Sequence, residues 1–407
     1  VGFQPSAAEL DAALARGRAA TVDHVFTASP GARHDELDAL GERLAQRNDI
    51  AAVQAWWLMR MVHTARPLAA RMTLFWHDHF ATSQVKVGDA LLMLGQLRTF
   101  ETLGLGHFGE LLRAMARDPA MIIWLDGNSN INGRANENFA RELFELFALG
   151  VGAYTESVIK EAARAFTGWH QRSGRYRFVA AMHDGGEKTV FGRRGRFDGD
   201  DVIDLVLEHP ACAPFLARKL CRAFVHPEPD AALVNEVAAT LRRTEYSIAA
   251  ALRTMLTAPS MTSPAAYRAR IKSPAEYAVG LVRSLELAPS GSTLNEAVCR
   301  MGQRLFEPPS VAGWEGHRAW INTATMLVRM NLAERLTAPA AFDAAAYCRV
   351  HGLSTPEAAT AHAFRLVLDG RVPEGMPGGE TSATSDVSEH FRLVLRACLF
   401  TPEYQLS

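Results

Sequence analysis

The residues best suited to chemistry lie on one apolar segment, residues 136–150. Read as an α-helix, this segment places Asn138, Glu142 and Glu145 at i, i+4 and i+7, on a single stripe. Arg141 lies beside that stripe, and almost every other side chain is apolar. A helix that is apolar nearly all round is normally buried, and burying carboxylates is costly unless they are paired or used. We therefore expect both glutamates to be mostly buried, in one polar cluster with Arg141 and Asn138.

The stripe has two interpretations. Arg141 and Glu145 are spaced i, i+4, so an internal ion pair can make the stripe a structural network that fixes helix register. Alternatively, two adjacent carboxylates raise the pKa of one of them, which is what acid–base catalysis needs. Under the second interpretation Glu142 and Glu145 are the preferred catalytic carboxylates.

A second polar group lies in the region that breaks the helical pattern, residues 170–197. Two short β-branched or aromatic runs flank a Gly-Gly pair there, which predicts a hairpin. His183, Asp184 and Lys188 surround this turn, where they can reach a ligand or form a solvated turn. We expect the hairpin to fold over residues 136–149. His183 or Asp184 would then supply the catalytic partner of one glutamate, and Lys188 would hold an anionic or hydroxyl group.

Further binding candidates are a histidine and two tryptophans. His77 and His79 end the helix expected over 67–80, and residues two apart on a helix point away from each other. We therefore do not expect both histidines to face inward. A His-x-His metal pair is disfavoured, and a hydrogen-bonded core position for His79 is the simpler interpretation. Trp169 and Trp314 follow glycines in loops, where an indole can stack on a sugar or anchor domain packing.

The composition is that of a protein with a large core. The 407 residues are 48% hydrophobic, enough for one large domain or two. The 43 basic and 44 acidic residues nearly cancel, which argues against a nucleic-acid binder. No apolar run approaches the roughly 20 residues that span a bilayer. The chain begins at Val1 without Met, so we expect a trimmed product, and a removed signal peptide is neither shown nor excluded.

Cofactor and metal motifs are missing from the sequence. There is no GxSxG, P-loop, HExxH or strand-borne GxGxxG pattern, so no cofactor is expected. The five cysteines are scattered and form no CxxC, which disfavours a thiolate zinc site. Buried free thiols are the simpler expectation, with one disulfide left open if the protein is exported. No metal is expected to be needed for folding.

Helical periodicity dominates the rest of the chain, and the predicted fold class is mainly α: a multi-helix globular bundle with a small β-hairpin insert. The domain prediction is a helical domain over 1–369 with the insert at about 170–197. A Gly-, Pro-, Ser- and Thr-rich flexible loop over 370–386 follows. A C-terminal helical segment, 387–407, is expected to pack back on the domain. The main predicted helices are 6–16, 35–47, 49–65, 67–80, 84–102, 108–118, 136–149, 156–167, 200–208, 213–225, 229–243, 246–258, 273–286, 292–305, 319–336 and 387–400.

Several motifs, taken in order, resemble the bacterial family known as domain of unknown function 1800. They include Phe75-Trp76-x-x-His79-Phe80, Asn136-Glu137-Asn138-x-x-Arg141-Glu142, His183-Asp184-x-x-x-Lys188, Lys219-Leu220, Lys272-Ser273-Pro274 and Gly313-Trp314. The resemblance covers nearly the whole chain. It implies a helical architecture, export to the periplasm or the outside, and a possible sulfatase-like protein partner. It also implies that His79 and the polar residues of the second and third motifs belong to the family's polar signature.

We therefore expect a cell-envelope enzyme, of glycoside-hydrolase type, that acts on a glycan or related polymer by carboxylate and histidine acid–base chemistry. The catalytic candidates are Glu142, Glu145, His183 and Asp184. The substrate-binding candidates are His79, Asn136, Glu137, Asn138, Arg141, Trp169, Lys188 and Trp314. One alternative is a non-catalytic exported assembly or binding protein that works with the sulfatase-like partner. The other is a metal-dependent hydrolase with a metal at His79 and Glu142. Neither nucleic-acid binding nor a membrane span is expected.

Overall fold

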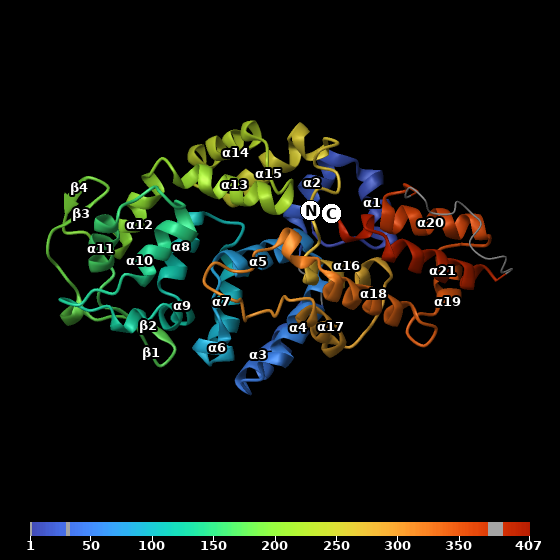
Figure 1. Ribbon diagram of the computed structural model, residues 1–407, viewed down its shortest axis with the longest axis horizontal. Helices are drawn as coiled ribbons and strands as arrows, with labels where there is room; N and C mark the ends of the chain where they lie inside the picture. Colours follow the sequence, from blue (N-terminus) through green and yellow to red (C-terminus); the bar gives the residue numbers. More distant parts are fainter. Residues whose placement is uncertain (1, 30–32, 373–385) are drawn as a thin grey trace.

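The computed structural model describes residues 2–29, 33–372 and 386–407, and within these ranges it is mainly α-helical (Figure 1). Twenty-one α-helices and two small antiparallel sheets of two strands each occur there. The predicted fold class is confirmed. No helix in the described ranges is both long and apolar enough to cross a membrane.

The helices and strands have the following bounds. The N-terminal half contains α1 (Ala7–Arg16), α2 (Arg18–Thr27), α3 (Arg33–Gln46), α4 (Ile50–Val62), α5 (Pro67–His79), α6 (Gln84–Val87), α7 (Ala90–Leu103), α8 (Phe108–Ala116), α9 (Pro119–Trp124), α10 (Asn138–Glu142), the π-helix η2 (Leu143–Ala148) and α11 (Glu156–Ala165). The strands are β1 (Trp169–Arg172), β2 (Arg175–Phe178), β3 (Lys188–Val190) and β4 (Arg193–Gly195). The remaining helices are α12 (Gly199–Glu208), α13 (Cys212–Phe224), α14 (Ala231–Arg243), α15 (Ile248–Thr257), α16 (Pro274–Ser284), α17 (Gly291–Arg300), α18 (Thr323–Thr337), α19 (Ala344–Val350), α20 (Pro356–Leu368) and α21 (Val387–Phe400).

Two hydrophobic cores organise these helices. One gathers apolar side chains from α8, η2 and α11–α15, and the other gathers them from α4, α7 and α16–α21. Helix α5 contributes to both, because Met72 and Trp76 belong to the first core and Leu74 to the second. Figure 1 shows α5 near the centre of the molecule, between the two groups of helices. Side chains on opposite sides of α5 are therefore buried.

The position of α5 corrects one expectation. His77 and His79 are only 1% and 4% exposed, so both face inward. His77 lies in the second core, where its Nε2 accepts a hydrogen bond from the Phe306 N–H at 2.9 Å. His79 lies against the first core, beside Phe80 and Phe147. The expectation assumed that one side of this helix faces solvent, whereas α5 is packed on two sides.

The β-insert consists of two hairpins rather than one. β1 pairs with β2, and β3 pairs with β4. The two runs that we expected to pair across the Gly-Gly turn lie in β2 and β3–β4, so each pairs locally instead. The connecting pairs Ser173-Gly174 and Phe191-Gly192 all have positive φ, between 48° and 78°. Such two-residue turns match the twist of paired strands, and they close shorter loops than the expected turn would.

The C-terminal helix α21 packs against α18, α19 and α20, within the second core. Most of the predicted flexible loop, residues 373–385, lies outside the described residues. All five cysteines are free, and four of them are buried.

Candidate functional site

The apolar segment that carries the glutamates is one helix that changes from α to π. The α-helical part, α10, is followed by η2, whose wider turns end where the N–H groups of Leu149 and Gly150 both donate to the carbonyl of Phe144. Gly150 has φ of 84°, as expected for a residue that terminates a helix. π-helical turns are rare and occur frequently at functional sites.

The side chains of this helix do not form the buried cluster that we predicted. Glu142 and Glu145 are half-buried, and Asn138 is exposed. Glu145 accepts a hydrogen bond from the Tyr154 hydroxyl at 2.9 Å. Burial, followed by the charge of Glu145, raises the pKa of Glu142. The stripe thus keeps one carboxyl of raised pKa, but one side of the helix faces solvent.

Arg141 binds acidic residues other than Glu145. Its guanidinium pairs with Glu137 at 3.0 Å and with Glu156, the first residue of α11, at 2.7 Å. Asn136 supports the start of the helix, since its Oδ1 accepts the Asn138 N–H at 2.9 Å. Local spacing suggested the wrong ion-pair partner because α11, which supplies Glu156, comes from a later part of the chain.

The candidate residues of the hairpin region, His183, Asp184 and Lys188, hold a turn in place through their own hydrogen bonds and ion pair. Asp184 pairs with Arg164 at 2.7 Å, and this guanidinium is the main reason that the pKa of Asp184 is lowered. His183 contacts the Thr167 carbonyl through Nδ1 at 2.9 Å. Lys188 is 1% exposed, and its Nζ donates to the carbonyl oxygens of Asp184 at 2.5 Å and Gly186 at 3.1 Å. These contacts stabilise the loop between the two hairpins.

The two polar groups lie at opposite ends of α11. Glu156 at its start pairs with Arg141, and Arg164 near its end pairs with Asp184. Eight residues of α-helix separate them, which corresponds to about 12 Å. No hydrogen bond or ion pair among the described residues joins His183 or Asp184 to either glutamate of the stripe. The four catalytic candidates are therefore not joined in one hydrogen-bonded cluster within the described residues.

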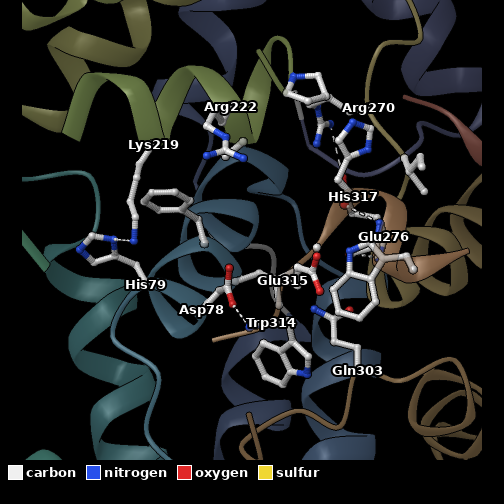
Figure 2. Close-up of a pocket in the computed structure, with 18 of the residues that line it drawn as sticks. Asp78, His79, Lys219, Arg222, Arg270, Glu276, Gln303, Trp314, Glu315 and His317 are labelled. Carbon is white, nitrogen blue, oxygen red and sulfur yellow. Dashed lines mark hydrogen bonds and ion pairs between the residues drawn. The ribbon is translucent and has the colours of Figure 1, made fainter. Parts of the chain in front are cut away.

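The two tryptophan candidates have different surroundings. Trp169 is 5% exposed, and the guanidinium of Arg117 lies 4.6 Å from its ring centroid. It therefore packs in the first core as an anchor. Trp314 lines a cavity of about 420 Å³ that opens where the two cores meet (Figure 2). His79 lines the same cavity.

The cavity has one wall from each core. Helices α5 and α13 form the first wall, with Asp78, Lys219 and Arg222 among its lining residues. The second wall comes from α16 and the loop between α17 and α18, and it includes Glu276 and Glu315. Figure 2 shows polar side chains from both walls directed toward the space between them. Ligand sites commonly occupy such boundaries between packed bodies.

Asp78 is held by the Gly-Trp turn opposite it. The Trp314 N–H donates to Asp78 Oδ1 at 2.8 Å. Gly313 has φ of 80°, and a Cβ at that position would lie 2.3 Å from the same oxygen, so the close approach requires glycine. Burial raises the pKa of Asp78 to about 6, although this hydrogen bond and Lys219 oppose the rise. Asp78 can therefore gain or lose a proton near neutral pH.

Lys219 and His79 form a hydrogen-bonded chain that ends on the π-helix. Lys219 Nζ lies 3.2 Å from His79 Nδ1 and 3.2 Å from the carbonyl oxygen of Leu146. His79 Nε2 lies 3.0 Å from the carbonyl oxygen of Phe147. Because a carbonyl can only accept, the partners assign the proton to Nε2 and leave Nδ1 to accept from the lysine. The hydrogen-bonded core interpretation of His79 thus agrees with the structure.

Burial adjusts the proton affinity of both members of this chain. It lowers the pKa of Lys219 to about 8, against the opposing attraction of Asp78. Burial and the neighbouring lysine also lower the pKa of His79 well below its usual range. His79 is therefore a neutral acceptor that orients Lys219, and Lys219 is the group that can exchange a proton.

A buried ion-pair network braces the second wall. Glu276 contacts Arg71 and Arg270, and its Oε2 accepts the Ser273 N–H at 2.8 Å in a capping box at the start of α16. Burial alone would raise the pKa of Glu276, but the two arginines outweigh it and hold the value at about 2. This network supports the cavity and connects its walls, because Arg71 belongs to α5.

Two charged side chains at the cavity have no internal partner among the described residues. Arg222 and Glu315 are exposed, and neither makes an ion pair or a side-chain hydrogen bond within the described residues. His317 follows in the same loop with a φ of 48°, and its buried Nδ1 has no hydrogen-bond partner in the described ranges. Side chains of this kind are available to a ligand.

Within the described residues, no group of three or more His, Cys, Asp or Glu side chains is arranged to hold a metal ion. His79 uses both of its ring nitrogens in the hydrogen bonds given above.

The fold and cavity define a helical protein with a charged cleft between two cores. Over residues 1–406 the chain matches the family model described as protein of unknown function (DUF1800). The chain therefore belongs to this family, which confirms the resemblance inferred from the motifs. No curated protein and no solved structure matches it.

Sequence reasoning missed most residues of the cavity but contained signals for some of them. Lys219 stands in one of the motifs that carried the family resemblance. Asp78 lies between His77 and His79, yet only the histidines were considered. Glu315 follows Trp314 in the second Gly-Trp loop. What was missing is the spatial relation between these segments, which are far apart in the sequence.

Proposed function

We propose that the cavity is the active site of an enzyme that cleaves a glycan or related polymer by acid–base chemistry. The proposal rests on Asp78 and Lys219. Burial shifts the pKa of the carboxyl up and that of the amine down, so both approach neutrality beside the same cavity. Opposite shifts of neighbouring titratable groups are typical of acid–base sites.

Asp78 is the proposed general acid, and Glu315 is the proposed second carboxylate. Glycoside cleavage uses one carboxyl of raised pKa to protonate the leaving oxygen, while a second carboxylate activates water or attacks the sugar. Asp78 has the required raised pKa, and Figure 2 shows the Glu315 side chain on the opposite wall. Lys219 stabilises negative charge near Asp78 and, as a neutral amine, can accept a proton.

The lining of the cavity suits a polar ligand with a few apolar faces. Its volume of about 420 Å³ lies within the range of small-ligand sites, so it holds a short stretch of a polymer rather than a long one. Phe75, Trp314 and Trp320 provide aromatic surface on which sugar rings can stack. Arg222 is free to bind a hydroxyl or an anionic group of the substrate.

The test is cleavage of neutral and uronate-containing oligosaccharides, measured by release of reducing ends. Asp78→Asn and Glu315→Gln should each lower kcat by about 10²–10⁴-fold, the usual contribution of a general acid or base. Glu142→Gln on the π-helix is the matched control and should retain activity. Equal activity in Asp78→Asn and wild type, or equal loss in Glu142→Gln, would overturn the assignment.

The same experiment separates this proposal from the alternative of a non-catalytic binding or assembly protein. Such a protein would bind an oligosaccharide, or a sulfatase-like partner, without producing reducing ends. As part of our proposal the enzyme acts in the periplasm or outside the cell, which is what the family resemblance implies.

A further inference from the structure

The hairpin β1–β2 has one strongly basic face. Its register pairs Arg172 with Arg175 and His170 with Arg177. Because directly paired residues of an antiparallel ladder lie on the same face, these four side chains point to one side of the hairpin. The three arginines are exposed, whereas His170 is buried.

Within the described residues, this face has no acidic counterpart. Together with Arg134, the three arginines line a hollow of about 1230 Å³ that contains no Asp or Glu among its lining residues. In the described part of the chain, none of the four guanidinium groups makes an ion pair or a side-chain hydrogen bond. Arg172 and Arg175 are moreover direct cross-strand neighbours, an arrangement of like charges that destabilises a hairpin.

The second hairpin provides a comparison within the same chain. Arg193 of β4 pairs with Glu208 at 2.7 Å, and Arg194 pairs with Glu187 at 2.6 Å. The chain contains as many acidic as basic residues, so carboxylates are not scarce. Repulsion between its arginines therefore lowers the stability of the β1–β2 hairpin, whereas the β3–β4 hairpin avoids this loss. An external anion bound to the arginines would offset the repulsion.

The chemistry of the hollow indicates the kind of anion. Guanidinium forks bind carboxylate and sulfate groups with two parallel hydrogen bonds. Asn128, Gln171 and Ser173 line the same hollow and can bond to hydroxyl groups. Among the described residues that line it, Phe178 is the one exposed aromatic side chain, since His170 is buried, and stacking of successive nucleic-acid bases needs several.

We propose that the basic face of the β1–β2 hairpin, formed by Arg134, Arg172, Arg175 and Arg177, binds an anionic polysaccharide chain through its carboxylate or sulfate groups. Figure 1 places this hairpin at the edge of the molecule, well away from α16, which belongs to the second wall of the cavity. The face is thus a separate attachment point for a polymer and does not depend on the proposed chemistry of the cavity.

The test measures binding alone, with fluorescently labelled heparin and polygalacturonate fragments and the full chain. The variant R175S/R177S should weaken binding by at least about tenfold, since two charge-assisted contacts are lost, and its affinity should depend less on salt. The control R193S/R194S removes the same number of charges from the other hairpin and should stay within about twofold of wild type.

Thermal melts of both variants show whether the fold is retained. If wild type fails to bind either polysaccharide at low salt, or if both double variants lose affinity equally, the proposal is wrong. Tighter binding of single-stranded DNA or of anionic lipid vesicles, lost in R175S/R177S, would also overturn it by assigning the face to another partner. Failure of the cavity to cleave glycans would leave these binding results unaffected.

Discussion

The acidic stripe on α10 and η2 and the cavity beside α5 differ in what surrounds their charges. The stripe has more carboxylates close together in the sequence, but it faces solvent on one side and its arginine pairs across to α11. At the cavity, Asp78 and Lys219 come from positions 141 residues apart in the sequence and lie between the two cores. Its groups undergo the larger pKa shifts because burial acts on them from two sides.

The comparison indicates that charged residues close together in the sequence are a weaker guide to a shifted pKa than the packing around a charged group. A partly exposed carboxylate keeps part of its hydration, so burial changes its proton affinity less. A carboxyl enclosed by two cores loses more hydration and changes its proton affinity more. Four measurements of stability test this distinction.

The largest effect is expected from Glu276→Ala at the cavity wall. The substitution leaves Arg71 and Arg270 without their shared carboxylate and should cost about 3–5 kcal/mol in the free energy of unfolding. Glu137→Ala, which removes a partly exposed partner of Arg141, is the matched control and should cost about 1 kcal/mol or less. Urea unfolding checks both values. Similar losses for the two variants would remove the difference between the regions.

The network also predicts a pH dependence. The folded-state pKa of Glu276, about 2, lies below its unfolded value, so its contribution to stability is fully present above the unfolded pKa. That contribution should be lost as the pH falls from about 4.5 toward 2. The stability difference between wild type and Glu276→Ala should therefore shrink over this window.

A smaller effect of opposite sign is expected from Asp78→Asn. The pKa of Asp78 is raised in the folded state to about 6, so deprotonation destabilises the fold. The amide keeps an oxygen for the Trp314 N–H and removes the buried charge, so stability at pH 7.5 should rise by about 1–3 kcal/mol. Below about pH 4, where the carboxyl is protonated in both states, the gain should vanish. A variant that is equally or less stable at pH 7.5 would show that the carboxylate is not strained.

The smallest effect is expected on the stripe itself. Glu142→Gln removes a half-buried carboxylate that has no ion pair within the described residues, and it should change stability by no more than about 0.5 kcal/mol. Chemical unfolding at neutral pH measures this change. A loss of several kcal/mol would mean that the stripe is the buried network first expected from its sequence.

Several helix ends follow from local signals in the sequence. Ser6 and Ser273 form capping boxes, Thr155 caps α11, and Gly150 ends the apolar helix. These features depend on neighbours within a few residues, so they can be read from one segment. Helix α20 was missed, although Thr355 and Pro356 mark its start.

Features that depend on distant segments were not predictable in the same way. The partner of Arg141 and the occupants of the cavity come from helices whose relative placement no spacing rule gives. His79 and Trp314 were selected as binding candidates and do line the cavity, whereas Asp78 was passed over. Its altered pKa results from two cores that meet only in the folded chain.

The π-helix makes the site sensitive to the length of one segment rather than to its composition. Residues 143–148 contribute backbone oxygens to His79 and Lys219, and any side chain of suitable size leaves those oxygens in place. A π turn holds more residues than an α turn, so deleting one residue would let the segment revert to an ordinary α-helix. The carbonyls of Leu146 and Phe147, which lie inside the widened segment, would then leave their present acceptor positions. The backbone contacts thus depend on the number of residues in this segment, whereas its buried side chains, those of Leu143, Phe144, Phe147 and Ala148, belong to the first core.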